Sequence, residues 1–164
     1  MMKEGLTINN YEKTGVLSVN DFKQPSEKQL KKGVVIVECV QMIPCNPCVA
    51  ICPVHAISMN DINDTPKVDF EKCTGCTSCV GICPGLAIFV VKIKDEKALI
   101  TLPYEFLPLP AVGSVVHALD REGKTRGPAK IVKVNTRGKT AVITIEVDKT
   151  LAMDVRMIKV MNYD

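Results

Sequence analysis

The chain has 164 residues, a formal net charge of +3 and 46% apolar residues, a composition suited to one globular domain or two small ones. Aromatic residues make up 4% and tryptophan is absent, which disfavours a large substrate pocket lined by rings. The first residues contain no apolar stretch of signal-peptide length, and the longest apolar run, residues 86–91, is too short to span a bilayer. We therefore expect a cytoplasmic protein with no membrane span.

Charge is unevenly distributed along the chain. Residues 1–110 carry 11 lysines against 12 acidic side chains, whereas residues 111–164 carry 6 lysines and 4 arginines against 6 acidic side chains. A basic segment can bind nucleic-acid phosphates, but this excess is modest, and Tyr163 is the only aromatic residue available for base stacking in the basic segment. A solvated face or a docking surface is the better interpretation, and we do not expect nucleic-acid binding.

Residues 1–33 are predicted to form an N-terminal arm that ends in a short helix. The arm is polar and shows no sustained hydrophobic period up to residue 25. Ser26 and Gln29 then have the spacing of a capping box, and Gly33 can end a helix. These signals predict a helix over residues 26–32.

Three strands are expected around the cysteines. Residues 34–37 are β-branched throughout and predict a buried strand that leads to Cys39. Further strands are expected near residues 56–59 and 87–94, and the polar residues 61–66 form the turn between the two halves.

The C-terminal third has a β pattern. The proline-rich residues 103–110 predict a stiff linker. Residues 111–164 contain strand-like segments separated by turns, and residues 140–147 alternate cleanly between apolar and polar side chains. We predict a small all-β, barrel-like module. Its expected strands are residues 114–119, 129–135, 140–147 and 156–161.

Two cysteine runs with the same pattern carry the main chemical signal. Residues 45–53 read CNPCVAICP and residues 76–84 read CTSCVGICP, with Cys73 preceding the second run at the CxxC interval. An internal duplication that aligns Cys45 with Cys76 explains this repeat. The copies differ in one place, because Met42 stands where the first run should have its leading cysteine, and Cys39 lies three residues earlier.

This spacing is typical of iron–sulfur ligands. A CxxCxxC run places three thiolates around one cubane cluster, and a following cysteine next to proline ligates the other cluster. A reducing cytosol disfavours disulfides, and zinc sites need neither the third cysteine nor the CP ending. The predicted ligands are Cys39, Cys45, Cys48 and Cys83 for the first cluster, and Cys52, Cys73, Cys76 and Cys79 for the second.

Cys39 completes the first set because it is the only cysteine left, and a loop can bring it back to Cys45. The alternative is a three-iron [3Fe–4S] cluster held by three cysteines, with Cys39 a buried free thiol. Met42 is assigned to packing or loop, since a thioether is a poor partner for these irons. His55 is assigned a surface or packing role, with an electrostatic influence on the cluster potential, and His117 a structural role.

Residues 34–94 resemble the bacterial-type two-[4Fe–4S] ferredoxin domain. Residues 73–84 match its motif without departure, and the first run departs at Met42. The resemblance implies a pseudo-twofold α+β fold with a hairpin from each half, two [4Fe–4S] clusters and one-electron transfer. We place this two-cluster domain at residues 34–102.

A narrower resemblance rests on residues 38–48, on CTGC at residues 73–76 and on PGLAI at residues 84–88. These segments are similar to the ferredoxin-like small subunits of multi-subunit, FAD-dependent dehydrogenases of amino acids and related small metabolites. The resemblance implies flavoprotein dehydrogenase subunits as partners in a hetero-oligomer. No catalytic set is evident, so we expect an electron-transfer subunit. The alternatives are an independent soluble ferredoxin and, less favoured, an iron–sulfur nucleic-acid binder.

Overall fold

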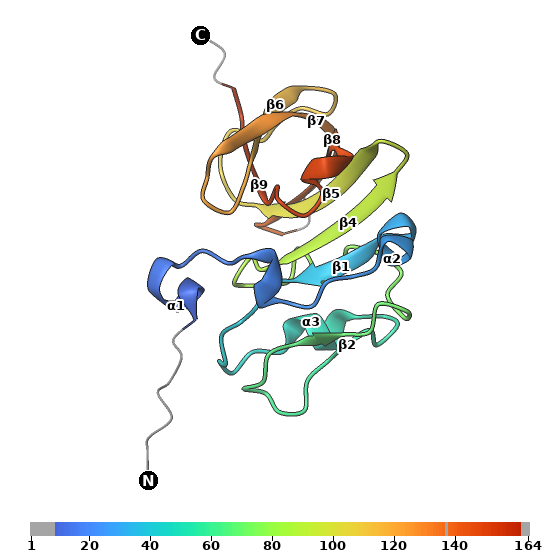
Figure 1. The fold of residues 1–164 in the computed structure, drawn as a ribbon, viewed down its shortest axis with the longest axis vertical. Coiled ribbons are helices and arrows are strands. Elements are labelled where there is room, and N and C mark those ends of the chain that lie inside the picture. The colour runs from blue at the N-terminus through green and yellow to red at the C-terminus, as the bar shows by residue number, and fades with distance from the viewer. Residues whose placement is uncertain (1–8, 137, 162–164) are drawn as a thin grey trace.

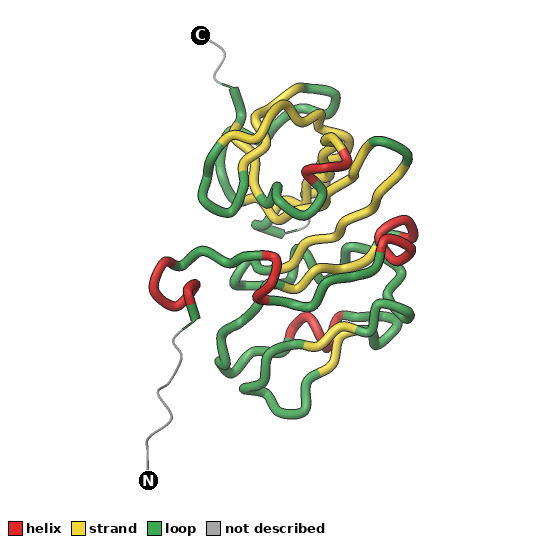
Figure 2. Tube along the Cα trace, in the orientation of Figure 1, coloured by secondary structure: helices red, strands yellow, loops and turns green. Residues whose placement is uncertain are grey.

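The computed structural model describes residues 9–136 and 138–161, so the predictions for residues 1–8, Arg137 and residues 162–164 lie outside the described part of the chain. Antiparallel strands dominate, and the helices are short (Figures 1 and 2). Within the described residues, no helix has the length and apolarity needed to cross a membrane.

The N-terminal arm contains short helical turns, and its last helix is the predicted one. Ser26 accepts a hydrogen bond from the Gln29 backbone N–H at 3.3 Å, and the Gln29 side chain accepts one from the Ser26 N–H at 2.9 Å. Gly33 ends the helix with a φ of 94°. The capping-box prediction is therefore confirmed. The elements of the arm are α1 (Asn10–Thr14), the 3-10 helix η1 (Val19–Asp21) and α2 (Glu27–Lys32).

Seven strands form one antiparallel sheet in the order β1-β4-β5-β8-β7-β6-β9. The strands are β1 (Val34–Val37), β4 (Ile88–Lys94), β5 (Lys97–Tyr104), β6 (Val115–Leu119), β7 (Thr125–Thr136), β8 (Ala141–Asp148) and β9 (Met157–Lys159). The pairings of β7 with β6 and with β8 each contain a register shift at which β7 has one extra residue, and such bulges increase local twist. Figure 1 shows the later strands curling round one end of the molecule.

The predicted barrel-like module differs from the observed structure in two respects. The described strands leave the sheet open, with β1 and β9 as its edges, so it is not a closed barrel. The sheet also does not begin at residue 111, because β5 pairs with β8 from Lys97↔Asp148 to Tyr104↔Ala141. β8 forms hydrogen bonds with the backbone groups of β5 on the side that faces away from β4. This pairing joins the two parts of the chain.

The cysteine region contains a second, two-stranded sheet made of β2 (Ile57–Ser58) and β3 (Lys67–Val68), together with α3 (Pro47–Ile51). The duplication that aligns Cys45 with Cys76 also relates the pair Ile57↔Val68 in this sheet to Ile88↔Val37 in the β1·β4 pair. Each pair thus combines strands from both copies, where we expected a hairpin from each half. A hairpin needs a short turn, but a whole cysteine run separates β1 from β2.

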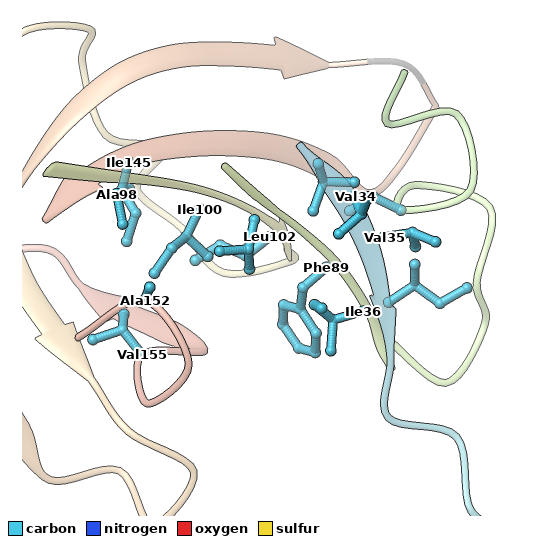
Figure 3. Packing of buried hydrophobic residues seen from close by; sticks show 14 of the residues in the cluster. Val34, Val35, Ile36, Phe89, Ala98, Ile100, Leu102, Ile145, Ala152 and Val155 are labelled. Carbon is cyan, nitrogen blue, oxygen red and sulfur yellow. The ribbon is translucent and has the colours of Figure 1, made fainter. Parts of the chain in front are cut away.

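One hydrophobic core extends through the predicted domain boundary. The buried cluster includes Val34 and Ile36 of β1, Ile100 of β5 and Ile145 of β8, all of them labelled in Figure 3, and β4 lies between β1 and β5. The 3-10 helix η2 (Lys149–Leu151) and the residues after it add further apolar side chains. The cysteine region is therefore packed on a large core that the rest of the chain helps to build.

Candidate metal centre

The structure gathers the eight cysteines, all of them free, around two separate hollows. The members of each group are the same as those of the predicted ligand sets, although iron binding by these residues stays a prediction. Cys52, Cys73, Cys76 and Cys79 line one hollow, and Cys39, Cys45, Cys48 and Cys83 line the other. We call these the second site and the first site.

The second site is small, with a volume of about 20 Å³, and its Cys76 is exposed. Backbone N–H groups point at its sulfurs: those of Val35 and Gly75 donate to Cys73 Sγ at 3.3 and 3.5 Å, and that of Ala56 donates to Cys52 Sγ at 3.2 Å. Such donors stabilise thiolate charge, and the thiolate is the ligating form of cysteine.

The first site is wider, about 1070 Å³, and the N-terminal arm forms part of its wall through Tyr11 and Leu17. The Ala87 N–H donates to Cys83 Sγ at 3.5 Å, which repeats the Ala56 to Cys52 bond of the other copy. Met42 lies on the rim and is 72% exposed, in agreement with a loop position.

The turn after each run is the same in both copies. His55 and Leu86 have φ values of 50° and 52°, and their N–H groups donate to the carbonyl oxygens of Cys52 and Cys83, each at 3.2 Å. His55 is exposed, as a surface role requires. The duplication therefore reproduces backbone geometry as well as cysteine spacing.

Burial raises the pKa of several thiols. Desolvation, followed by the charge of Cys83, raises the pKa of Cys48 to about 11. Desolvation, followed by the charge of Cys73, raises the pKa of Cys79 to about 12. Burial likewise raises the pKa of Cys39. Without positive charge in the hollows these thiols stay protonated near neutral pH, and a bound metal supplies that charge.

The donor set fits a cluster better than a single ion. Within residues 9–136 and 138–161, no three cysteine, histidine or acidic side chains converge as ligands of one metal ion. The thiols instead surround each hollow, an arrangement that suits a cluster in which each thiolate binds a different iron. Four sulfur donors with backbone N–H groups nearby are therefore consistent with an iron–sulfur cluster at each site.

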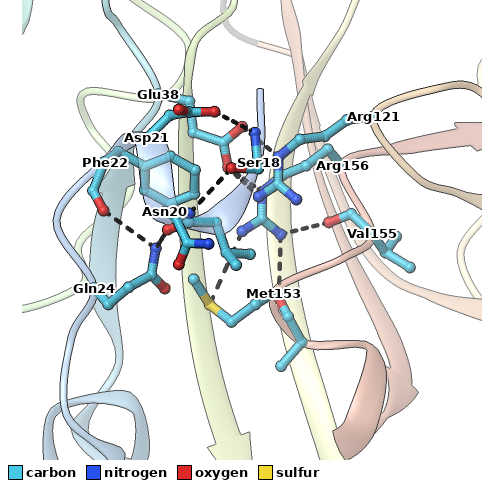
Figure 4. A network of polar contacts seen from close by, with 12 residues as sticks. Ser18, Asn20, Asp21, Phe22, Gln24, Glu38, Arg121, Met153, Val155 and Arg156 are labelled. Atoms are coloured by element: carbon cyan, nitrogen blue, oxygen red, sulfur yellow. Dashed lines mark hydrogen bonds and ion pairs between the residues drawn. The ribbon is translucent and has the colours of Figure 1, made fainter. Parts of the chain in front are cut away.

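A buried ion network beside the first site was missed at the sequence level (Figure 4). Glu38 accepts hydrogen bonds from Arg121 and Arg156, two side chains of the segment expected to form a solvated or docking face. These partners lie 83 and 118 residues from Glu38 in the sequence, so no local pattern identifies them. The only signal is an acidic residue that directly follows a buried strand.

A family model described as a 4Fe-4S dicluster domain matches residues 38–87, a segment that contains all eight cysteines. Searches of curated proteins and of solved structures give no match. The family match supports a ferredoxin-like iron–sulfur domain, with [4Fe–4S] binding, in this part of the chain.

Proposed function

We propose that this chain is the electron-transfer subunit of a larger flavoenzyme and passes single electrons through two [4Fe–4S] clusters, from a flavin on a partner subunit to an acceptor. The observation that carries this proposal is the division of eight thiols between two hollows, four to each. A bound cluster takes up one electron and releases it again, so the two electrons of a reduced flavin leave in turn while its two protons go to solvent.

The chain itself supplies the ligands and keeps the two sites close together. Cys52 belongs to the first run but lines the second site, and Cys83 belongs to the second run but lines the first site. Because each run serves both sites, the sites are neighbours, as stepwise electron transfer between them requires. Backbone N–H groups and the apolar core hold the sulfurs in place.

Two features favour a fixed subunit over a diffusing ferredoxin. Residues 1–110 are together nearly neutral, whereas a shuttle gains from a strong single-sign charge that steers encounters. Apolar side chains are also exposed, among them Met42 at 72% and Ile43 at 50% on the rim of the first site, and Leu107 at 86% in a loop far along the sequence. Exposed apolar surface of this kind is typical of protein interfaces.

Anaerobic purification of the full chain from its native source tests the proposal. We expect a stable cytoplasmic complex with FAD-containing subunits and about eight irons per copy of this chain. Recovery as a lone brown monomer that serves several reductases would refute the flavoenzyme assignment and support the independent ferredoxin. Absence of iron–sulfur signals from freshly isolated protein would refute electron transfer itself.

Cys39→Ser tests the composition of the first site, with Cys76→Ser as the matched control. If Cys39 is a ligand of a four-iron cluster, its substitution diminishes the first cluster's EPR signal, and Cys76→Ser diminishes only the second. A strong three-iron signal in fresh protein that Cys39→Ser leaves unchanged would identify the first cluster as [3Fe–4S] and Cys39 as a free thiol.

A further inference from the structure

The ion network joins the C-terminal part of the chain to the first site. Glu38 directly precedes Cys39 and lines the first hollow. Its carboxylate accepts bonds from Arg121 Nε at 2.9 Å and Nη2 at 2.7 Å, and from Arg156 Nε at 2.6 Å. Exposed fractions of the side chains are 6% for Glu38, 12% for Arg121 and 4% for Arg156. This is a buried triad, unlike the screened ion pairs of a surface.

The remaining contacts hold both guanidinium groups in place. Arg156 Nη1 donates to the carbonyl oxygens of Val155 at 2.6 Å and Ala152 at 3.1 Å, and its Cζ lies 5.2 Å from the centre of the Phe89 ring. Arg121 stacks on Phe22 of the arm at 5.3 Å. Two arginines thus share one carboxylate, and each rests on an aromatic face that attracts cations.

The triad carries a net charge of +1. Desolvation lowers the pKa of Arg156, and the Glu38 charge opposes that effect, so the guanidinium stays ionised at neutral pH. The acids Asp120 and Asp154 face this region and share one partner, Arg126, at 3.7 and 3.6 Å, so these three side chains together carry −1. The charged residues that line the first hollow are the acids Glu12, Glu38 and Asp64, so Arg121 and Arg156 offset acidic charge beside Cys39.

The second site has no equivalent triad among the described residues. Asp69 occupies the position that the duplication relates to Glu38: its N–H donates to the Ala56 carbonyl at 2.8 Å, as that of Glu38 donates to Ala87. The Asp69 side chain, however, is 46% exposed, and its only ion-pair partner is Lys72, at 3.6 Å. The Lys72 side chain is itself 62% exposed. That pair is neutral and screened by solvent.

We propose that Arg121 and Arg156 are positioning residues that raise the reduction potential of a cluster at the first site by neutralising Glu38, the acid that precedes Cys39. This inference rests on the proposed function. Reduction adds one negative charge to a cluster, and fixed positive charge in a water-poor setting stabilises that charge.

Arg121→Gln is the direct test, because it removes one charge and leaves the Arg156–Glu38 pair intact. EPR-monitored redox titration of the full chain should show a lower potential for the first cluster and none of this change for the second. We expect roughly a three-fold shift in the ratio of reduced to oxidised cluster, about 28 mV at 59 mV per decade. Arg121→Lys, which keeps the charge, should restore most of the potential.

Arg126→Gln is the matched control, since it removes the same charge from a side chain that is 43% exposed and does not contact Glu38. Equal shifts in Arg121→Gln and Arg126→Gln, or no shift in either at full iron content, would overturn the inference while leaving the proposed function standing. If the Gln variant loses iron, Arg121→Met gives the same measurement, because it keeps packing on Phe22 without the charge.

Discussion

Gly75 is the residue at which the structure makes the sharpest stability prediction. It has a φ of +65°, and a Cβ added there would lie 2.8 Å from the backbone oxygen of Gly33. A side chain in this left-handed conformation costs about 1–2 kcal/mol, and relieving the overlap by moving backbone costs about 1–3 kcal/mol more. Gly75→Ala should therefore lower the stability by about 2–5 kcal/mol. For a protein of this size that is a fall in Tm of about 4–20 °C.

The same substitution should weaken the second site. Gly33 directly precedes β1, and both the Val35 and Gly75 N–H groups donate to Cys73 Sγ. Separating Gly75 from Gly33 displaces these donors from the sulfur, so the variant should lose iron from the second site first. Thermal unfolding followed by circular dichroism, with iron analysis of anaerobically reconstituted protein, measures both effects.

Gly123→Ala separates the two causes. Gly123 has a φ of +78° but nothing lies within 4 Å of its added Cβ. The Gly123→Ala variant should lose only the stability that corresponds to the left-handed conformation, about 1–2 kcal/mol or roughly 2–8 °C in Tm, and it should keep its full iron content. Equal losses in the two variants would refute the close approach of Gly75 to Gly33.

Two further predictions concern thiol and hydroxyl groups. In metal-free protein at neutral pH, iodoacetamide should label Cys76 at least about ten-fold faster than Cys48 or Cys79. Burial acts to raise the pKa of Cys76, but hydrogen bonds with Ser78 and Thr74 outweigh burial and lower that pKa. Cys48 and Cys79 remain protonated, because their pKa values are about 11 and 12. Peptide mass spectrometry measures the order, and equal rates would contradict it. The hydroxyls of Thr101 and Thr144 lie 2.8 Å apart between β5 and β8, so Thr144→Val should cost about 1–3 kcal/mol in urea unfolding by leaving the Thr101 hydroxyl unpaired. Adding Thr101→Val should recover most of that loss, and additive losses would argue against the bond.

The cysteine spacing was informative because ligand geometry is local. Three thiols within one short run must lie close together whatever the rest of the chain does, and α3 (Pro47–Ile51) lies within the first run. Cys52 and Cys83 could be assigned to the opposite site only from the general rule that a cysteine next to proline ligates the other cluster. Glu38 and its two arginines followed no such rule, since their contacts depend on how the later strands return to β1.

The strands were predictable and their pairing was not. The alternation of β8 tells which of its faces is buried but not which strand lies beside it. Proline is disfavoured inside a sheet, so the sequence predicts a linker that begins at Pro103. In the structure Pro103 belongs to β5, but the β4 pairing ends at Thr101, so Pro103 has a neighbour on one side only, Val142 of β8. Proline is tolerated there for the same reason as on an edge strand. The division into domains remains a prediction.

The shared sheet also bears on how such a protein can change over evolution or in the laboratory. Truncation of the chain in the proline-rich stretch would remove β8 and leave the backbone of Lys97–Tyr104 as an unpaired sheet edge that is prone to aggregation. It would also remove both arginine partners of Glu38. The cysteine-bearing part is thus not expected to fold as a separate fragment that ends at that point. Its sites depend on the C-terminal strands, so a substitution in β8 or near Arg121 also changes the surroundings of the first site.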